Sequence, residues 1–377
     1  MRNAYLILIF LFLAGCSKLQ STPNETTSTV EEDAYKIAVI APQCGPYEAL
    51  GLSIVHGAEL AVDLKNGSGG IDGKKIKLVK IDDGGLASEG TVKAKSLVSE
   101  MVLGVIGHLN SDISIPASEI YAGAKIPEIS PGSTSPLLTK REKVKGYIFR
   151  TIGSDDKQGE FCAKYIVDKG FQKVAVLFNN RTYGSSLAGE FTSKLNTLSK
   201  NIEIVFHKSY RVKQGDFSKE VSDLKLAMPD VVFFVGEYGD GARFLKELRG
   251  ADVNSTFLGS EGVYDEEFIK AGKGASDGAL VVSLPEVKDK NFQEEYKKKF
   301  KKELGSYSAN SFDGANILIS AIEKIKEEDP GKIAKSVSET KNYSGITGNI
   351  SFDENGDLID PGFTLYEVKN GTFVAIR

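Results

Sequence analysis

The stretch "VIGHLNSDISIPASEIY" (105–121) joins a buried strand directly to an amphipathic helix. An apolar run over 102–106 ends in His-Leu-Asn-Ser-Asp, and apolar residues then recur at helical spacing, with Pro116 expected in the first turn of the helix. The first N–H groups of a helix have no partners inside it, so the backbone amides and the Ser111 hydroxyl at this junction favour a small anion. We interpret the junction as part of a binding site.

The same alternation of strand and helix runs through most of the chain. A first cycle has strands at 35–42, 75–83, 102–109 and 126–135 and helices at 50–66, 89–101 and 111–125. A second cycle has helices at 156–170, 184–199, 217–228, 241–251 and 265–272 and strands at 173–180, 203–210, 230–236, 255–262 and 278–285. Such alternation is typical of a parallel sheet with helices on both faces. Two cycles predict an α/β fold with two doubly wound parallel-sheet lobes.

The chain changes character after residue 285. Lysine-rich amphipathic helices are expected at 292–305, 311–328 and 332–339, with their charges on solvated faces. The tail over 348–376 contains Asn-Gly twice, at 355–356 and 370–371. Asn-Gly between apolar runs predicts β-hairpins.

The first residues lie outside the fold that these patterns predict. Arg2 precedes an apolar run that is too short for a membrane-spanning helix and ends in "LAGC" (13–16). Small residues before a cysteine resemble a bacterial lipobox, which implies that 1–16 is a lipoprotein signal and that Cys16 carries the lipid anchor. A plain signal peptide and an uncleaved anchor are the alternatives. Residues 17–34 are polar and without period, and predict a flexible tether.

Composition and motifs exclude several classes of function. The net charge of −4 argues against a nucleic-acid-binding protein, which would need a basic surface. His56, His108 and His207 form no metal-binding motif, and the sequence contains neither a nucleophile elbow nor a phosphate-binding loop. We therefore expect no enzyme, no metal and no cofactor. Cys44 and Cys162 lie in segments predicted to be far apart, so we expect free thiols.

The carboxyl ends of the predicted strands carry the candidate site, because ligands of parallel sheets bind there. In the first cycle Ser111, Ser133 and Thr134 offer hydroxyls and N–H groups that suit a carboxylate. The second cycle contributes two acids and two tyrosines: Glu237, Glu261, Tyr183 and Tyr238. An anion site opposite an acid suits a zwitterion. Helix capping by the Ser and Thr side chains, and solvated loop charge for the acids, are the alternative interpretations.

Five segments carry a resemblance to a known family. They are "NGSGGIDGKKIKLVKIDD" (66–83), "GVIGHLNSDISIPASEIYAGAKIPEISPGSTSPLLT" (104–139), "FRTIGSDDKQG" (149–159), "LFNNRTYGSSLA" (177–188) and "FLGSEGV" (257–263). Together they resemble the periplasmic leucine/isoleucine/valine-binding proteins, solute-binding proteins of ABC transporters with the type I periplasmic-binding fold, over nearly the whole chain from residue 35. The resemblance implies an N-terminal lobe of 35–151 plus 284–347 and a C-terminal lobe of 152–283 plus 348–377. Three crossovers near Thr151, Leu284 and Gly348 would join the lobes, which close on the ligand like a hinge.

The resemblance also implies roles for single residues at the carboxylate end of a bound amino acid. The hydroxyls of Ser111 and Thr134 match positions that hold the α-carboxylate, and the backbone of Leu109 and Gly132 lies nearby in the family. A charge-assisted hydrogen bond in a closed cleft contributes about 1.5–3 kcal/mol. We therefore expect the hydroxyls to bind the ligand without covalent chemistry.

Three further residues match positions at the other end of the ligand. Tyr183 would close over the α-amino group, Glu261 would pair with the ammonium, and Tyr307 would lie near the side-chain pocket. Known members carry a disulfide between the loops that here contain Gly85 and Asn110, so that bridge is absent.

Two departures concern the ligand's side chain. The family has a tyrosine where Glu237 aligns, and a shift of one residue would restore it as Tyr238. Leu50 replaces an aromatic residue of the cleft, and Tyr47 is close enough to compensate. These changes leave the identity of the ligand's side chain open.

The prediction from sequence is a monomeric, exported, lipid-anchored protein, in the periplasm or on the outer face of the cell membrane. It would bind an amino acid with a branched-chain or aliphatic side chain and deliver it to the membrane subunits of an ABC permease. A ligand sensor of the same fold for amino acids or amides is one alternative. An exported two-domain enzyme is another, but it would need a nucleophile–base pair or a metal cluster.

Overall fold

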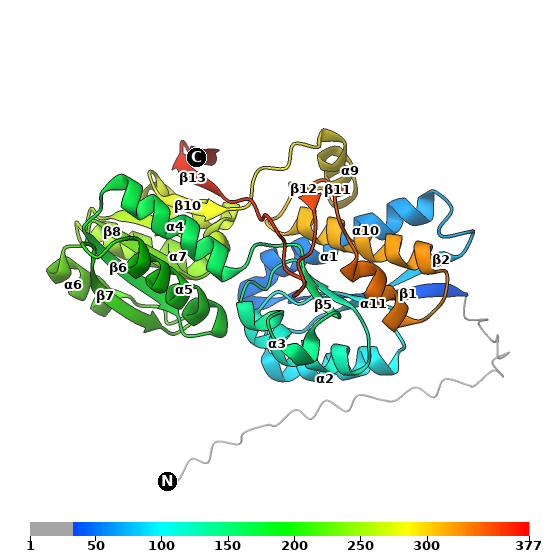
Figure 1. The fold of residues 1–377 in the computed structure, drawn as a ribbon. Helices are drawn as coiled ribbons and strands as arrows, with labels where there is room; N and C mark the ends of the chain where they lie inside the picture. Colours follow the sequence, from blue (N-terminus) through cyan, green and yellow to red (C-terminus); the bar gives the residue numbers. More distant parts are fainter. Residues whose placement is uncertain (1–32, 377) are drawn as a thin grey trace, which may run out of the picture. The chain divides into compact units, whose positions relative to one another are not determined.

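The computed structural model describes residues 33–376. The predicted lipidation of Cys16 and most of the predicted tether lie outside these residues. From Ala34 onward the chain forms one unit that contains two large sheets (Figure 1). We call each large sheet, with the helices packed on it, a lobe.

The first lobe is built on a five-stranded parallel sheet in the order β2-β1-β3-β4-β5. Its strands are β1 (Ala34–Ile40), β2 (Lys75–Ile81), β3 (Val105–Gly107), β4 (Glu128–Ser130) and β5 (Ile148–Arg150). Along β1, Ile37 and Val39 join the core with α1 (Glu48–Gly67), α10 (Ser308–Ile325) and α11 (Pro330–Ser338). Ala38 and Ile40 point the other way, into the core with α2 (Ala87–Ser99) and α3 (Ser111–Gly123). Alternate side chains of a strand point to opposite faces, so the sheet is covered on both sides, as predicted (Figure 1).

The second lobe is built on a seven-stranded sheet in the order β14-β13-β10-β9-β8-β6-β7. Its first five strands in the chain are parallel: β6 (Lys173–Asn179), β7 (Glu203–Tyr210), β8 (Val231–Val235), β9 (Thr256–Gly259) and β10 (Leu280–Ser283). One face packs on α4 (Asp155–Lys169) and α5 (Thr182–Leu198). The other packs on α6 (Ser218–Ala227), α7 (Tyr238–Gly250) and α8 (Glu266–Gly272). The predicted α/β class with two parallel-sheet cores is confirmed.

The sheet of the second lobe is completed by the C-terminal hairpin. β13 (Thr364–Lys369) pairs antiparallel with β10, and β14 (Thr372–Ala375) pairs antiparallel with β13. Asn370 and Gly371 form the turn with φ of 51° and 76°, the left-handed values that an Asn-Gly hairpin turn requires. The predicted hairpin is confirmed, and the outer edge of this sheet is antiparallel rather than parallel.

The third connection between the lobes lies later in the chain than Gly348. β12 (Gly348–Ile350) pairs with β11 (Tyr343–Gly345), and the Phe352 ring packs on Phe149 of the first lobe with the ring centroids 5.3 Å apart. Asp357 forms an ion pair with Arg150 at 2.7 Å. The chain pairs with the second sheet only from Thr364. We therefore move the proposed third crossover to residues 358–363.

Two further details differ from the sequence-based prediction. Helix α3 begins at Ser111, so Pro116 lies inside the helix and not in its first turn. Strand β5 was not predicted. The early start of α3 matters for the site, because it places free N–H groups next to Leu109. Cys44 is exposed and Cys162 is buried on α4, and both are free thiols.

Candidate functional site

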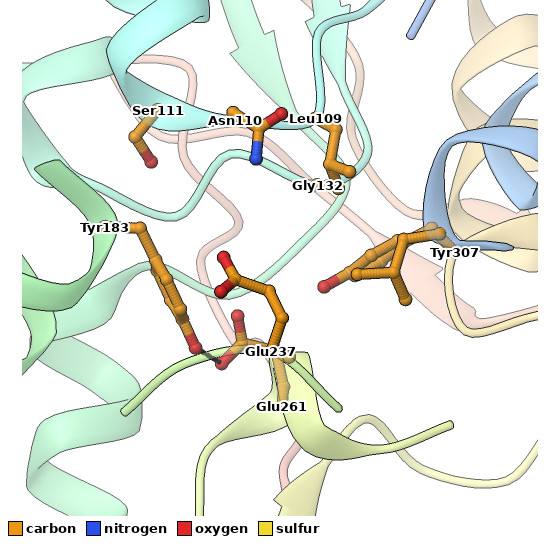
Figure 2. Close-up of a pocket in the computed structure, with 10 residues that line it drawn as sticks. Leu109, Asn110, Ser111, Gly132, Tyr183, Glu237, Glu261 and Tyr307 are labelled. Carbon is orange, nitrogen blue, oxygen red and sulfur yellow. Dashed lines mark hydrogen bonds between the residues drawn. The ribbon is translucent and has the colours of Figure 1, made fainter. Parts of the chain in front are cut away.

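A cavity lies where the carboxyl ends of the strands of both lobes meet (Figure 2). It encloses about 320 Å³, counting space open to solvent, and is lined by Leu50, Leu109, Asn110, Ser111, Gly132, Tyr183, Glu237, Glu261, Gly262 and Tyr307. The sequence-based list and the lining residues overlap at Leu109, Ser111, Gly132, Tyr183, Glu237, Glu261 and Tyr307.

The first-lobe wall of the cavity is the start of α3. The Asn110 carbonyl accepts the N–H groups of Ile113 and Ser114, each at 2.9 Å. Among residues 33–376, no acceptor pairs with the N–H groups of Ser111 and Asp112. Ser111 lines the cavity, so this wall presents unpaired donors at the positive end of a helix, where an anion is stabilised.

Ser133 and Thr134 lie behind this wall and do not line the cavity. The Ser133 hydroxyl donates to the Leu109 carbonyl at 2.9 Å and also contacts the Ser114 hydroxyl. It therefore holds the β3–α3 junction in place. The buried Thr134 hydroxyl finds no hydrogen-bond partner within the described part of the chain.

His108 also stabilises this junction. Its ring is fully buried, with Nδ1 at 2.7 Å from the Asp83 carboxylate and Nε2 at 3.2 Å from the Tyr121 hydroxyl. Both ring nitrogens are occupied by these partners and neither reaches the cavity. A buried histidine held in this way is part of the scaffold rather than a catalytic base.

The second-lobe wall carries two buried carboxylates, of which Glu261 is the first. Glu261 follows β9 and is 3% exposed, and its Oε2 accepts a hydrogen bond from the Tyr183 hydroxyl at 2.9 Å (Figure 2). Burial and, to a lesser extent, the nearby Asp155 carboxylate raise the pKa of Glu261 to about 7, against hydrogen bonds from Gln158 and Tyr183 that lower it. The carboxylate therefore lacks a cationic partner.

Glu237 is the second carboxylate of this wall. It lies between β8 and α7, is 8% exposed, and accepts hydrogen bonds from Asn179 Nδ2 at 3.0 and 3.2 Å. Burial raises its pKa to about 7, and the Arg181 guanidinium opposes this rise. Tyr238, the next residue, does not line the cavity and packs against the core of the first lobe. Glu237, not Tyr238, therefore occupies the cavity position.

Aromatic and apolar side chains close the remaining side. Tyr307 precedes α10, is 3% exposed and directs its hydroxyl into the cavity (Figure 2). Leu50 of α1 lines the cavity, whereas Tyr47 does not. The Tyr47 ring lies under the Arg181 guanidinium, 5.0 Å from its centroid.

Sequence reasoning did not assign a role to Asn110, Gly262 or Arg181. Asn110 and Gly262 lie in the strand-end segments already singled out, so the signal was present. Arg181 bridges the lobes: it contacts both carboxylate oxygens of Asp112 on α3, at 2.8 and 3.0 Å, and donates to the Gly85 carbonyl at 3.1 Å. Asp112 and Arg181 lie 69 residues apart, so nothing local predicts their pairing.

Other chemistries find no support in the described residues. Residues 33–376 contain no group of three or more His, Cys, Asp or Glu side chains that could hold a metal ion. Within the same residues, no helix combines the length and apolar character needed to cross a membrane. The cavity thus offers free N–H donors on one wall and buried carboxylates on the other.

Comparisons with known proteins agree with this geometry. The model of the periplasmic binding protein family matches residues 34–372. Leu/Ile/Val-binding protein homolog 1 of Brucella suis biovar 1 is 32% identical over 339 residues, 89% of this chain and 90% of that protein. The leucine-, isoleucine-, valine-, threonine- and alanine-binding protein of Pseudomonas aeruginosa is 31% identical over 343 residues, again 89% and 90% of the two chains.

Solved structures show the same relationship. The leucine-binding protein LivK of Thermotoga maritima superimposes with a TM-score of 0.84 at 28% identity, over 91% of this chain and 98% of its own. The branched-chain amino acid binding protein LivJ of Streptococcus pneumoniae gives a TM-score of 0.83 at 25% identity, over the same shares of the two chains. These relatives are solute-binding proteins and not enzymes. The chain belongs to the periplasmic binding protein family, within the group of substrate-binding proteins of branched-chain amino acid ABC transporters.

Proposed function

We propose that this protein is an extracytoplasmic solute-binding lipoprotein that binds an α-amino acid in the cavity and delivers it to an ABC permease. One observation carries the proposal. Unpaired N–H groups at the start of α3 face the buried carboxylate of Glu261, so the two walls match the two charges of a zwitterion.

The residue roles follow from the walls. The Ser111 hydroxyl and the first N–H groups of α3 bind the α-carboxylate, with the backbone of Leu109 and Gly132 beside them. Glu261 pairs with the ammonium group, and the Tyr183 hydroxyl holds that carboxylate in place. No step forms or breaks a covalent bond.

Branched-chain and aliphatic amino acids are the first candidates. The Streptococcus pneumoniae LivJ structure is a complex with isoleucine, and a substrate-binding protein of Desulfitobacterium hafniense, 27% identical with a TM-score of 0.76, is a complex with leucine. Leu50 and Leu109 supply apolar surface for such side chains.

The membrane part of the proposal rests on the sequence. The "LAGC" segment at 13–16 supports lipidation of Cys16, and the relatives' transport systems support a permease partner. We further propose that the protein acts as a monomer, with lobes of 35–151 plus 284–357 and 152–283 plus 364–377.

Thermal unfolding of the purified protein, alone and with each common amino acid, tests the proposal. A ligand at 100 times its dissociation constant adds about 2.7 kcal/mol to the stability of the folded state, which raises the melting temperature measurably. We expect at least one amino acid to do so, and calorimetry to confirm one site per chain. A panel in which no amino acid raises the melting temperature contradicts the proposal.

A further inference from the structure

Glu237 remains unexplained by the binding of a zwitterion. The start of α3 satisfies the α-carboxylate, and Glu261 satisfies the ammonium group. Glu237 adds a second carboxylate that is 8% exposed and points into the same cavity (Figure 2). An aliphatic side chain has neither a hydrogen-bond donor nor a positive charge that could pair with this carboxylate.

Glu237 is poorly satisfied by the residues around it. Its two oxygens accept hydrogen bonds from one neutral donor, Asn179 Nδ2, although an ionised carboxylate has room for about four. The nearest cation is Arg181, whose Nε and Nη2 contact both oxygens of Asp112 and whose Nη2 also donates to the Gly85 carbonyl. Arg181 is thus paired with Asp112, and within residues 33–376 no ion pair reaches Glu237.

The position of Glu237 in the fold does not account for the residue either. It is the residue before α7, where a side chain often caps the helix, but its carboxylate caps no N–H group. Glutamate is not among the preferred capping residues, which are Ser, Thr, Asp and Asn. The side chain is turned into the cavity instead.

The opposite wall offers Glu237 no positive charge. Asn110 lines the same cavity, and its side-chain amide nitrogen, not its oxygen, is directed toward Glu237 (Figure 2). An amide is neutral, so it can donate a hydrogen bond but cannot balance the charge of a carboxylate. A buried carboxylate without a cation therefore favours a cationic donor on the ligand, because an unpaired buried charge is costly.

We propose that Glu237 selects an α-amino acid whose side chain ends in a hydrogen-bond donor, with a protonated amine preferred. The inference rests on the proposed function, since it needs the α-amino and α-carboxylate groups to bind as described. It keeps the α-amino acid of the proposed function but replaces an aliphatic side chain by a basic one as the preferred ligand. A cationic side chain meets the charge of Glu237, whereas an aliphatic side chain of the same shape leaves that charge buried and unpaired.

Calorimetry with two isosteric pairs tests the preference. L-ornithine differs from L-norleucine, and L-2,4-diaminobutyrate from L-norvaline, only by an ammonium group in place of the terminal methyl group. We expect the wild-type protein to bind at least one of the diamino acids ten or more times as tightly as its aliphatic partner. Glu237→Gln keeps an acceptor for Asn179, and in this variant the ratio of the affinity for the diamino acid to the affinity for its aliphatic partner should fall at least tenfold. In Glu237→Leu the aliphatic partner should bind more tightly than the diamino acid.

The controls separate this inference from the proposed function. Glu266→Gln alters a glutamate whose side chain is 65% exposed, and it should leave the ratio of the two affinities unchanged. Circular dichroism checks that each variant is folded. Wild-type protein that binds norleucine, norvaline or leucine at least as tightly as both diamino acids overturns the inference and leaves the proposed function intact. If Glu237→Gln keeps the wild-type ratio of diamino-acid to aliphatic affinity, the inference is likewise overturned and the proposed function stays intact. Wild-type protein that binds no α-amino acid at all overturns both.

Discussion

The two walls of the cavity present opposite chemistry. The first-lobe wall is neutral: it presents backbone N–H groups and the Ser111 hydroxyl at the start of α3. The second-lobe wall carries Glu261 and Glu237, both buried and both with a raised pKa. Free N–H groups at a helix start are present whether or not a ligand is bound, whereas a buried carboxylate is unfavourable until a cation or a proton meets it. The second wall should therefore control affinity more strongly than the first.

The largest effect is expected from Glu261→Gln. Removing one partner of a buried charge pair costs about 2–5 kcal/mol, or roughly 30-fold to several-thousand-fold in dissociation constant. Calorimetry should show that binding of every α-amino acid is nearly lost, while thermal unfolding without ligand shows a folded protein. Affinity within threefold of the wild type would mean that the ammonium group binds elsewhere.

A smaller loss is expected on the neutral wall, from Ser111→Ala. A hydrogen bond to a charged group contributes about 1.5–3 kcal/mol, or roughly 10- to 150-fold in affinity, and the backbone N–H groups of α3 stay in place. Ser118→Ala, on the same helix and bonded to the Ile115 carbonyl at 2.8 Å, is the matched control and should not change the dissociation constant. A loss larger than that of Glu261→Gln would reverse the order of the two walls.

The raised pKa of Glu261 predicts opposite effects of pH on stability and on binding. Without ligand, the folded protein keeps a proton on Glu261 up to a pKa of about 7, whereas the unfolded chain releases it near the ordinary value of about 4.3. The contribution of Glu261 to stability is therefore present below about pH 4 and is lost as pH rises toward 7. Affinity for the ligand should instead rise as pH rises toward 7, because the ligand's ammonium group pairs with the ionised form of Glu261.

Melting temperatures and dissociation constants at pH 5.5, 6.5 and 7.5 check both trends. The affinity of the wild-type protein should fall up to about tenfold per pH unit below 7. In Glu261→Gln, both the residual affinity and the melting temperature should depend less steeply on pH. An affinity that rises on acidification would contradict the assignment of Glu261 to the ammonium group.

The smallest effect is expected from the contact that joins the walls, Arg181 to Asp112. These side chains are 16% and 27% exposed, so solvent screens the pair and Asp112→Asn should weaken ligand binding by about 0.5–1 kcal/mol, or two- to fivefold. Asp223→Asn removes an ion pair with Lys208 on the surface of the second lobe and is the control, with no expected change in affinity. Tenfold tighter binding in Asp112→Asn would show that the pair opposes the ligand-bound state.

The predictability of the site differed between the walls. Six residues chosen from the strand–helix pattern and the family resemblance line the cavity: Leu109, Ser111, Gly132, Tyr183, Glu261 and Tyr307. Ser133 and Thr134 were assigned to the ligand from the same pattern, but they do not line the cavity. The sequence shows which residues follow a strand; it does not show whether a hydroxyl turns toward the cavity or toward a neighbouring carbonyl.

What the sequence by itself determined is local. The strand and helix periods, the free N–H groups after β3, and the Asn370–Gly371 turn each arise within a few residues, so the α/β class and the position of the first wall followed from the chain alone. Strand β5 was missed, whereas β3 and β4, which also have three residues each, were predicted within longer segments.

Only the tertiary structure decided the remaining features. Glu237 is the extended residue before α7 and Tyr238 is the first residue of the helix, so the packing of α7 on its sheet decides which of the two side chains enters the cavity, and no local signal does. The Arg181–Asp112 pair joins positions 69 residues apart on different lobes. The unpaired charge of Glu237 likewise becomes visible only when Asn179, Arg181 and Asp112 are seen together, because whether a carboxylate is satisfied depends on neighbours that the chain brings from elsewhere.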